Sequence, residues 1–285
     1  MSQRGIVIRQ INTFLFLTLI FSSLFYWLII TGFTASHEVS QYFRWWMWCP
    51  GFAALVTQLI NRQGIHGLGW NWSGASSLLI AYCIPLFCVL AAYGVLWITG
   101  LGPFFGVSHP SRSLPAGTDV RATSKLVAFS ATAGVLRRCF AALGEEIGWR
   151  GFLVPRLSKL MEFPRVAFLS GLIWSVWHYP VVIFGGYNQR TSMWFALPCF
   201  TTMIIAMSML LAWLRLKSGS VWPCMVFHAS QNLFPGMMAQ FTVETRYTRY
   251  FAGEFGALLP MAFLMAAAVI WQFAGEQNYT ILRQS

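Results

Sequence analysis

The chain has 285 residues, of which 57% are hydrophobic, 17% are aromatic and only 9% are charged. Soluble domains carry about 25% charged residues, so this composition, with a mean hydropathy of +0.59, excludes an ordinary soluble protein and predicts an integral membrane protein. The net charge of +11 does not indicate nucleic-acid binding, because the basic residues lie in short loops between apolar runs. We expect the lipid bilayer as a partner and no nucleic acid.

The first apolar run starts close to the N-terminus, after a basic segment that contains Arg4 and Arg9. It extends from Thr13 to Thr31, which is longer than the roughly 7–15 residues of a signal-peptide core. The small-residue pattern of a cleavage site is also poor. We therefore expect an uncleaved first span whose basic end stays in the cytoplasm.

Apolar runs recur along the whole chain, and a helix needs about 20 such residues to cross a bilayer. Six long candidates cover residues 13–34, 76–99, 124–143, 164–184, 192–214 and 255–274. Two shorter candidates cover residues 45–60 and 218–235. Prolines interrupt several runs, but neighbouring helices in a bundle can bond the backbone groups that are freed. The sequence predicts an all-α fold, a polytopic membrane bundle of about eight transmembrane helices.

Neither the longest segment between the apolar runs nor the cysteines carry a motif of a catalytic or metal-binding site. Residues 100–123 are rich in Gly, Pro and Ser, which predicts an irregular loop. The six cysteines form no CxxC pair and lie mostly in apolar runs, which predicts free thiols rather than disulfides or a zinc knuckle. An even number of spans puts both termini on one side. The larger share of Lys and Arg falls on that side, which predicts a multi-pass protein of the cell membrane with both termini in the cytoplasm.

Two of the chain's eight acidic residues stand together in the segment GEEIGWRG, residues 144–151, directly after the predicted span 124–143. Ionisable residues at membrane depth are costly and usually functional. On a helix, Glu146 and Arg150 are i,i+4 neighbours that can pair. Glu145 points about 100° away from Glu146 and is left to face another partner. The structural alternative is a surface ion pair at an interfacial helix end.

Two further polar groups lie in apolar segments. His178, in WSVWHYPVV, follows Trp174 by one helical turn and precedes Pro180, where the helix is expected to kink or end. His228 and Asn232, in MVFHASQNLF, are i,i+4 neighbours on one face of a short helix. The structural alternatives are a hydrogen-bonded core histidine for the first group and a polar contact between helices for the second.

Together these side chains match the needs of a hydrolase. Hydrolysis requires a base for water and donors for a developing oxyanion. The chain has no HExxH motif, which argues against the soluble zinc-protease type. It also has no GxSxG motif, which argues against a serine hydrolase.

The three motifs, in this order and in a multi-span protein, resemble those of the CAAX protease and bacteriocin-processing family. This family is also called CPBP or Abi and includes the type II CAAX prenyl endopeptidases. The first motif, EExxxR, runs from Glu145 to Arg150. The second, an aromatic residue followed by xxxHis, runs from Trp174 to His178, where the family more often has Phe at the first position. The third, HisxxxAsn, runs from His228 to Asn232. The three motifs together span residues 145–232, about a third of the chain.

The resemblance implies an intramembrane endopeptidase with an eight-helix fold. Glu145 would be the general base that activates water, and Glu146 and Arg150 would hold the geometry of the site. A desolvated carboxyl group suits this role, because a base works best when its pKa lies near the working pH. The implied substrates are membrane-embedded or lipidated peptides and proteins, with CAAX-type C-termini among them.

The histidines of the resemblance have two possible uses. His178 would orient the water or polarise the carbonyl group, while His228 and Asn232 would stabilise the oxyanion. Alternatively, Glu145, His178 and His228 could form a zinc site of the His₂Glu type. The family has been described both as metalloproteases and as metal-independent glutamate proteases, and we favour glutamate-activated water.

The motifs also suggest a division of the chain. Residues 1–123 would hold the N-terminal transmembrane helices and the polar loop, residues 124–240 the CPBP-like catalytic core, and residues 241–285 a C-terminal transmembrane helix. Two other functions remain open. A non-catalytic membrane scaffold or bacteriocin-immunity protein of the same family would keep these residues as a polar core. A transporter would use Glu and His as a proton relay, but we see none of the inverted repeats that it would favour.

Overall fold

In the computed structural model, the described residues are 2–34, 40–104, 120–187 and 191–281. Within them every regular element is a helix, and the β-type contacts amount to one isolated bridge between Phe104 and Thr242. The all-α fold class predicted from the sequence is therefore confirmed.

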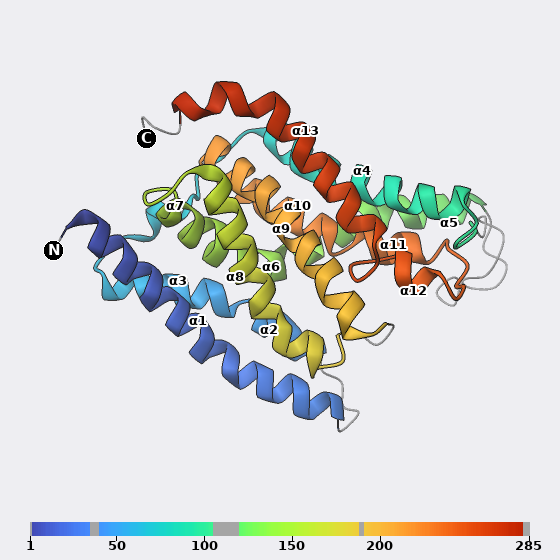
Figure 1. Cartoon of the computed structure of the whole chain (residues 1–285), viewed down its shortest axis with the longest axis horizontal. Coiled ribbons are helices and arrows are strands. Elements are labelled where there is room, and N and C mark those ends of the chain that lie inside the picture. The colour runs from blue at the N-terminus through green and yellow to red at the C-terminus, as the bar shows by residue number, and fades with distance from the viewer. Residues whose placement is uncertain (1, 35–39, 105–119, 188–190, 282–285) are drawn as a thin grey trace.

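The bundle is built from long helices and one composite helix (Figure 1). The long helices are α1 (Gln3–Thr34), α4 (Ala75–Ile98), α8 (Phe163–Ile183), α9 (Met193–Ser218) and α13 (Leu258–Ile281). The composite helix joins α5 (Val120–Phe129), η2 (Ser130–Gly134), α6 (Val135–Glu146), η3 (Ile147–Leu153) and α7 (Val154–Leu157). Both η2 and η3 are π-helical. The shorter elements are α2 (Ser40–Trp46), α3 (Cys49–Ile60), η1 (Ile65–Leu68), α10 (Trp222–Gln231), α11 (Phe234–Ala239) and α12 (Thr248–Phe251).

Several of these helices can cross a membrane by length and composition. The five long apolar stretches are Gln3–Phe33, Ala75–Ile98, Val127–Leu157, Phe163–Ile183 and Met193–Ser218. A shorter apolar stretch covers Leu258–Gln272. They correspond to the six long runs read from the sequence and indicate a multi-pass membrane protein.

The extents of three predicted spans differ from the structure. The span placed at 124–143 does not end there, because the helix continues through GEEIGWRG to Leu157. The charged groups of this segment bond to one another and to neighbouring helices. They therefore do not need contact with water, and the helix continues through them. The runs 45–60 and 218–235 are divided into short helices, and 12-residue α3 covers only about 18 Å of a hydrocarbon layer about 30 Å thick. By length and composition, five long helices and one shorter helix of the described residues can cross a membrane, and the two short candidates do not reach that length.

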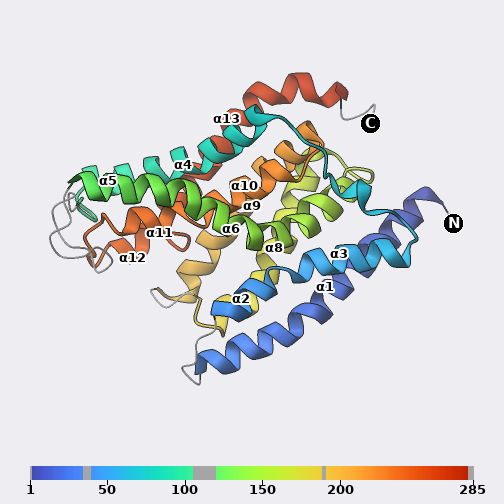
Figure 2. The ribbon, with the colours of Figure 1, turned by 180° about the vertical axis from the view of Figure 1, so that it is seen from behind.

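The segments between helices gather at two ends of the molecule. At one end, which we call the terminal end, Trp222 donates from Nε1 to the carbonyl of Trp70 at 3.0 Å, and both chain termini lie on this side in Figures 1 and 2. At the opposite distal end, Trp97 donates from Nε1 to Thr242 Oγ1 at 2.9 Å. The described helices run between these two ends.

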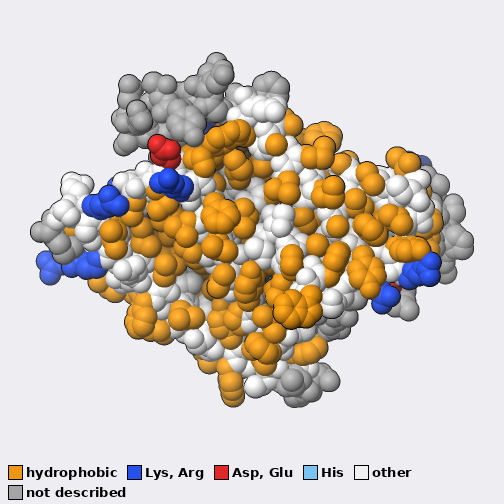
Figure 3. Space-filling view, in the orientation of Figure 1, with side chains coloured by type: hydrophobic (Ala, Val, Ile, Leu, Met, Phe, Trp, Pro, Cys, Tyr) orange, Lys and Arg blue, Asp and Glu red, His pale blue; other side chains and the backbone are white. Residues whose placement is uncertain are grey.

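The surface between the two ends is apolar. Figure 3 shows hydrophobic side chains across the middle of one face, with Lys and Arg gathered toward the terminal end and near α12. Exposed large hydrophobic residues occur along the outer sides of the long helices, among them Phe16, Leu79 and Trp194. This pattern is what a bilayer belt between two wetted ends requires.

A close crossing of α3 over the composite helix positions the GEEIGWRG segment. A Cβ atom on Gly51 of α3 would stand 2.6 Å from the carbonyl oxygen of Gly144. A Cβ atom on Gly148 would stand 2.6 Å from the backbone carbon of Pro50. Gly144 and Gly148 form a GxxxG pair, a pattern that lets membrane helices approach closely. Because these glycines face α3, the acidic pair between them is turned toward α8 and α10.

We expect Gly148→Ala to lower the stability of the protein, because the new methyl group has no room against Pro50. Overpacking of this kind costs about 1–3 kcal/mol. Gly94→Ala in α4 is the matched control, because a Cβ atom there meets nothing within 4 Å and the helix gains about 0.5–1 kcal/mol. Thermal unfolding of the detergent-purified proteins measures the difference. Equal midpoints for the two variants would contradict the close crossing.

Candidate active site

Glu146 and Arg150 form a fully buried ion pair, as their i,i+4 spacing predicted. Arg150 Nη1 lies 3.0 Å from Glu146 Oε1, and neither side chain is exposed. His228 of α10 reaches the same carboxylate oxygen with Nδ1 at 2.9 Å. Glu146 therefore joins the composite helix to α10, and the structural alternative of an interfacial surface pair is wrong for this residue.

The guanidinium of Arg150 also ties the composite helix to two further helices. Its Nη2 donates to Ser208 Oγ of α9 at 3.0 Å, and Ser208 Oγ lies 3.2 Å from Ser170 Oγ of α8. The guanidinium carbon stands 4.2 Å from the ring centroid of Trp174, a cation–π contact. Arg150 thus has a buried anion, hydroxyls and an aromatic face as partners, which offset the cost of removing its charge from water.

Glu145 faces a different environment from its neighbour. Its Oε2 atom accepts hydrogen bonds from Trp174 Nε1 at 2.6 Å and from Trp149 Nε1 at 3.3 Å, and the residue is 1% exposed. Among the described residues, Glu145 makes no ion pair. The two adjacent carboxylates are therefore held in different ways: Glu146 by cations, Glu145 by the N–H groups of two indoles.

His178 lies in an aromatic enclosure on α8. Its Nδ1 is 2.8 Å from the carbonyl oxygen of Trp174, and because a carbonyl only accepts, Nδ1 carries the hydrogen. The lone pair of the neutral ring is then on Nε2. The rings of Trp46, Trp177 and Phe200 surround the imidazole, with centroids 4.8–5.3 Å away.

Trp174 is the centre around which the site assembles. Besides its bonds to Glu145 and His178, its ring centroid lies 5.3 Å from that of His228 and 5.9 Å from that of His178. The structure thus brings five predicted residues around one indole: Glu145, Glu146, Arg150, His178 and His228. The sixth, Asn232, directly follows α10 and is half-buried on the wall of the adjoining cavities.

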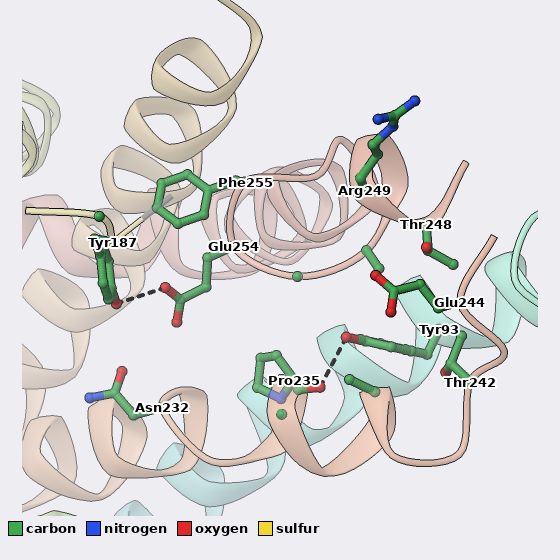
Figure 4. A pocket seen from close by; sticks show the side chains of 15 residues that line it. Tyr93, Tyr187, Asn232, Pro235, Thr242, Glu244, Thr248, Arg249, Glu254 and Phe255 are labelled. Atoms are coloured by element: carbon green, nitrogen blue, oxygen red, sulfur yellow. Dashed lines mark hydrogen bonds between the residues drawn. The ribbon is translucent and has the colours of Figure 1, made fainter. Parts of the chain in front are cut away.

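Two cavities adjoin this cluster. The smaller, of about 20 Å³, is lined by both histidines, Trp174 and Gln231, with several apolar side chains. A cavity of this size holds about one water molecule. The larger, of about 560 Å³, lies at the distal end. Both cavities share Tyr187, Asn232 and Glu254, so these residues stand where the two spaces meet (Figure 4).

Reasoning from the sequence missed several residues of the site. Gln231 could have been found, because it lies three residues after His228 on the same helix face and next to Asn232. Trp149 occupies an unspecified position of the EExxxR motif, four residues after Glu145. Ser208 belongs to no motif, and only the packing of α9 brings it to the guanidinium of Arg150. Glu254 lies in the loop between α12 and α13, where nothing in the local sequence points to the cavities.

The fit of a metal ion can be judged from the donor atoms. Within the described ranges, no group of three or more His, Cys, Asp or Glu side chains is placed to hold a metal ion. One oxygen of Glu145 is engaged by two indole N–H groups, and the cysteines are free, as predicted. The described residues do not fit the alternative His₂Glu zinc site, and we derive no step through a metal.

Comparison with known proteins identifies the core of the chain. Residues 127–234 match the family model described as "Type II CAAX prenyl endopeptidase Rce1-like". This segment therefore resembles the Rce1-like type II CAAX prenyl endopeptidases. It contains all six predicted site residues, and the family resemblance read from the three motifs is confirmed.

A curated relative agrees with the Rce1-like assignment. The protein named "CAAX prenyl protease 2" from Methanococcus maripaludis is 32% identical over 135 residues. The match covers 46% of this chain and 46% of that protein. The match thus spans less than half the length of this relative.

We expect Arg150→Gln to destabilise the Rce1-like core, because Glu146 would keep a buried charge without its main partner. Removing one member of a buried pair costs about 3–5 kcal/mol. The double variant Arg150→Gln/Glu146→Gln should recover part of that loss, since a glutamine carbonyl can still accept from His228. Thermal unfolding measures the series, with exposed Arg165→Gln as the control. An Arg150→Gln protein that unfolds at the wild-type temperature would rule out the structural role of the pair.

Proposed function

We propose that the protein is an intramembrane endopeptidase that hydrolyses peptide bonds of membrane-associated substrates, CAAX-type C-termini among them, with water activated by Glu145. The observation that carries the proposal is the contrast between the two buried carboxylates. Glu146 is neutralised by Arg150, whereas Glu145 has only indole donors among the described residues and is left with the basicity of a desolvated carboxylate. The family match of the surrounding segment supports the reaction class.

In the proposed mechanism, Glu145 takes a proton from water, and the resulting hydroxide attacks the carbonyl carbon of the scissile bond. The small cavity, lined by Trp174 and both histidines, is the proposed position of this water. His178, with its lone pair on Nε2, accepts from the water and orients it. The proton on Glu145 then passes to the amine that leaves when the C–N bond breaks.

His228 is the proposed hydrogen-bond donor to the oxyanion. Glu146 accepts the Nδ1 hydrogen of His228 and stabilises positive charge on that ring, so that Nε2–H can donate to the developing oxyanion. Asn232 contributes an amide donor from the same side. Gln231 lines the same cavity and can hold the water with its carbonyl oxygen.

The test is Glu145→Gln, which keeps the size of the side chain and an oxygen that can accept from Trp174. We expect cleavage of an internally quenched farnesylated CAAX-type peptide to fall about 10²–10⁴-fold, with thermal unfolding unchanged. Exposed Glu162→Gln is the control and should cleave at the wild-type rate. A folded Glu145→Gln protein that cleaves normally would sink the assignment of the base. Zinc analysis of the same samples should give far less than one ion per chain, and one tightly bound zinc would favour the metalloprotease alternative.

A second function is the non-catalytic scaffold or immunity protein of the same family. It requires that the buried cluster act only as a polar core, so Glu145→Gln would leave the cellular phenotype intact. The small cavity beside both histidines favours the enzyme, because a purely structural core gains nothing from an open, polar space.

We further propose that the chain passes through the membrane eight times with both termini in the cytoplasm. This is supported by α3 and α10, which connect the two ends of the bundle despite their short length. Before α3, Phe43 contacts Tyr187 at the distal end, and after it Trp70 contacts Trp222 at the terminal end. After α10, Thr242 returns to the distal end beside Trp97.

Reporter domains fused to the two termini of the full chain test this topology. We expect both fusions to be active only with a reporter that works in the cytoplasm. If both reporters work only outside, the proposed topology is wrong.

A further inference from the structure

The carboxylate of Glu254 stands at the junction of the two cavities. It lines both of them, together with Tyr187 and Asn232. The hydroxyl of Tyr187 donates to Glu254 Oε2 at 3.0 Å. Figure 4 shows the carboxylate directed from the loop before α13 toward Tyr187 and Asn232. A peptide that reaches the histidines from the large cavity therefore passes this carboxylate.

The large cavity is acidic in a chain that is strongly basic overall. Two of the eight acidic residues, Glu244 and Glu254, line it, whereas the chain carries a net charge of +11. In Figure 4 the carboxylate of Glu244 turns into the space, and the guanidinium of Arg249 points away from the other residues. The lining of the large cavity thus carries two carboxylates and one guanidinium, that of Arg249.

No cation among the described residues lies within ion-pair distance of Glu254. Burial raises the pKa of the Glu254 carboxyl, while the hydrogen bond from Tyr187 and the charges of His228 and Arg138 lower it. A substrate cation in contact with the Glu254 carboxyl would favour the ionised form of that carboxyl. Because the carboxylate is partly removed from water, its attraction to the cation would be strong.

A second buried acceptor lies on the same path. The Oε1 atom of Gln231 has no hydrogen-bond partner among the described residues, and the side chain is 1% exposed. Gln231 and Glu254 both line the small cavity. An unpaired buried acceptor is costly unless a ligand or water donates to it. The junction is therefore rich in acceptors and suits a group with several N–H donors.

We propose that Glu254 selects substrates that carry a lysine or arginine within a few residues of the scissile bond. The inference deepens the proposed endopeptidase function and rests on it. The carboxylate of Glu254 holds the cationic side chain at the junction, with Tyr187 fixing the orientation of the carboxylate. The scissile carbonyl is thereby placed at the small cavity beside the histidines.

The experiment compares two sets of internally quenched farnesylated CAAX-type peptides. In one set a single lysine occupies, in turn, each position within three residues of the scissile bond other than that of the farnesylated cysteine, and in the other set norleucine replaces it. The measured quantity is the ratio of kcat/KM for lysine and norleucine at each position. We expect the wild-type enzyme to prefer lysine by about tenfold or more at one position, as for a partly buried charge pair. Glu254→Gln should bring that ratio to about one.

Controls separate charge recognition from folding. Glu162→Gln removes an exposed carboxylate that lines neither cavity, so this variant should keep the wild-type ratio. Thermal unfolding of Glu254→Gln establishes that the variant is folded. A wild-type ratio near one at every position, or an unchanged ratio in folded Glu254→Gln, overturns the inference while leaving the endopeptidase function standing.

A binding measurement covers the case in which the wild-type enzyme cleaves no peptide, which would count against the proposed function itself. The same peptides, with a fluorescent label, are titrated onto Glu145→Gln and onto Glu145→Gln/Glu254→Gln. Tighter binding of the lysine peptides only where Glu254 is intact supports cation recognition. Equal affinities for lysine and norleucine peptides on both proteins overturn it.

Discussion

The buried ion pair between Glu146 and Arg150 is the interaction on which the rest of the site depends. Neither side chain reaches water, and the two bond at 3.0 Å within one helix. Because an unpaired charge at this depth would be very costly, further hydrogen bonds from two other helices stabilise the pair. His228 brings α10 to the carboxylate, and Ser208 brings α9 to the guanidinium. One ion pair thereby fixes the relative positions of three segments that are far apart in sequence.

The close glycine crossing makes this arrangement possible. Gly144 and Gly148 allow α3 to pack against one side of the composite helix, so that the acidic residues between them must face the opposite side. The π-helical segment that follows carries Trp149 and Arg150. Such π-helical turns are rare and are often found at functional sites. Here Trp149 donates back to Glu145 from within that turn.

Trp174 shows how one residue can connect the parts of a catalytic cluster. Its indole N–H holds Glu145, its ring lies under Arg150, and its carbonyl fixes the hydrogen of His178 on Nδ1. A phenylalanine, which the resemblance makes the commoner residue at this position, would keep the ring but not the N–H bond. The orientation of Glu145 in this chain is thus set in part by a hydrogen bond that a phenylalanine could not make.

The sequence alone determined the class of the protein and the residues of its core. Composition required a membrane, because so few charges cannot cover a soluble surface, and i,i+4 spacing was enough to pair Glu146 with Arg150 on one helix. The three motifs also identified the family. What the sequence could not determine was which partners meet across helices, because packing contacts leave no local periodicity. Ser208 and Glu254 entered the site only through tertiary structure. The same holds for helix extents: the span continues through GEEIGWRG because its charged groups pair with one another and bond to residues of distant helices, contacts that hydropathy along the chain does not record.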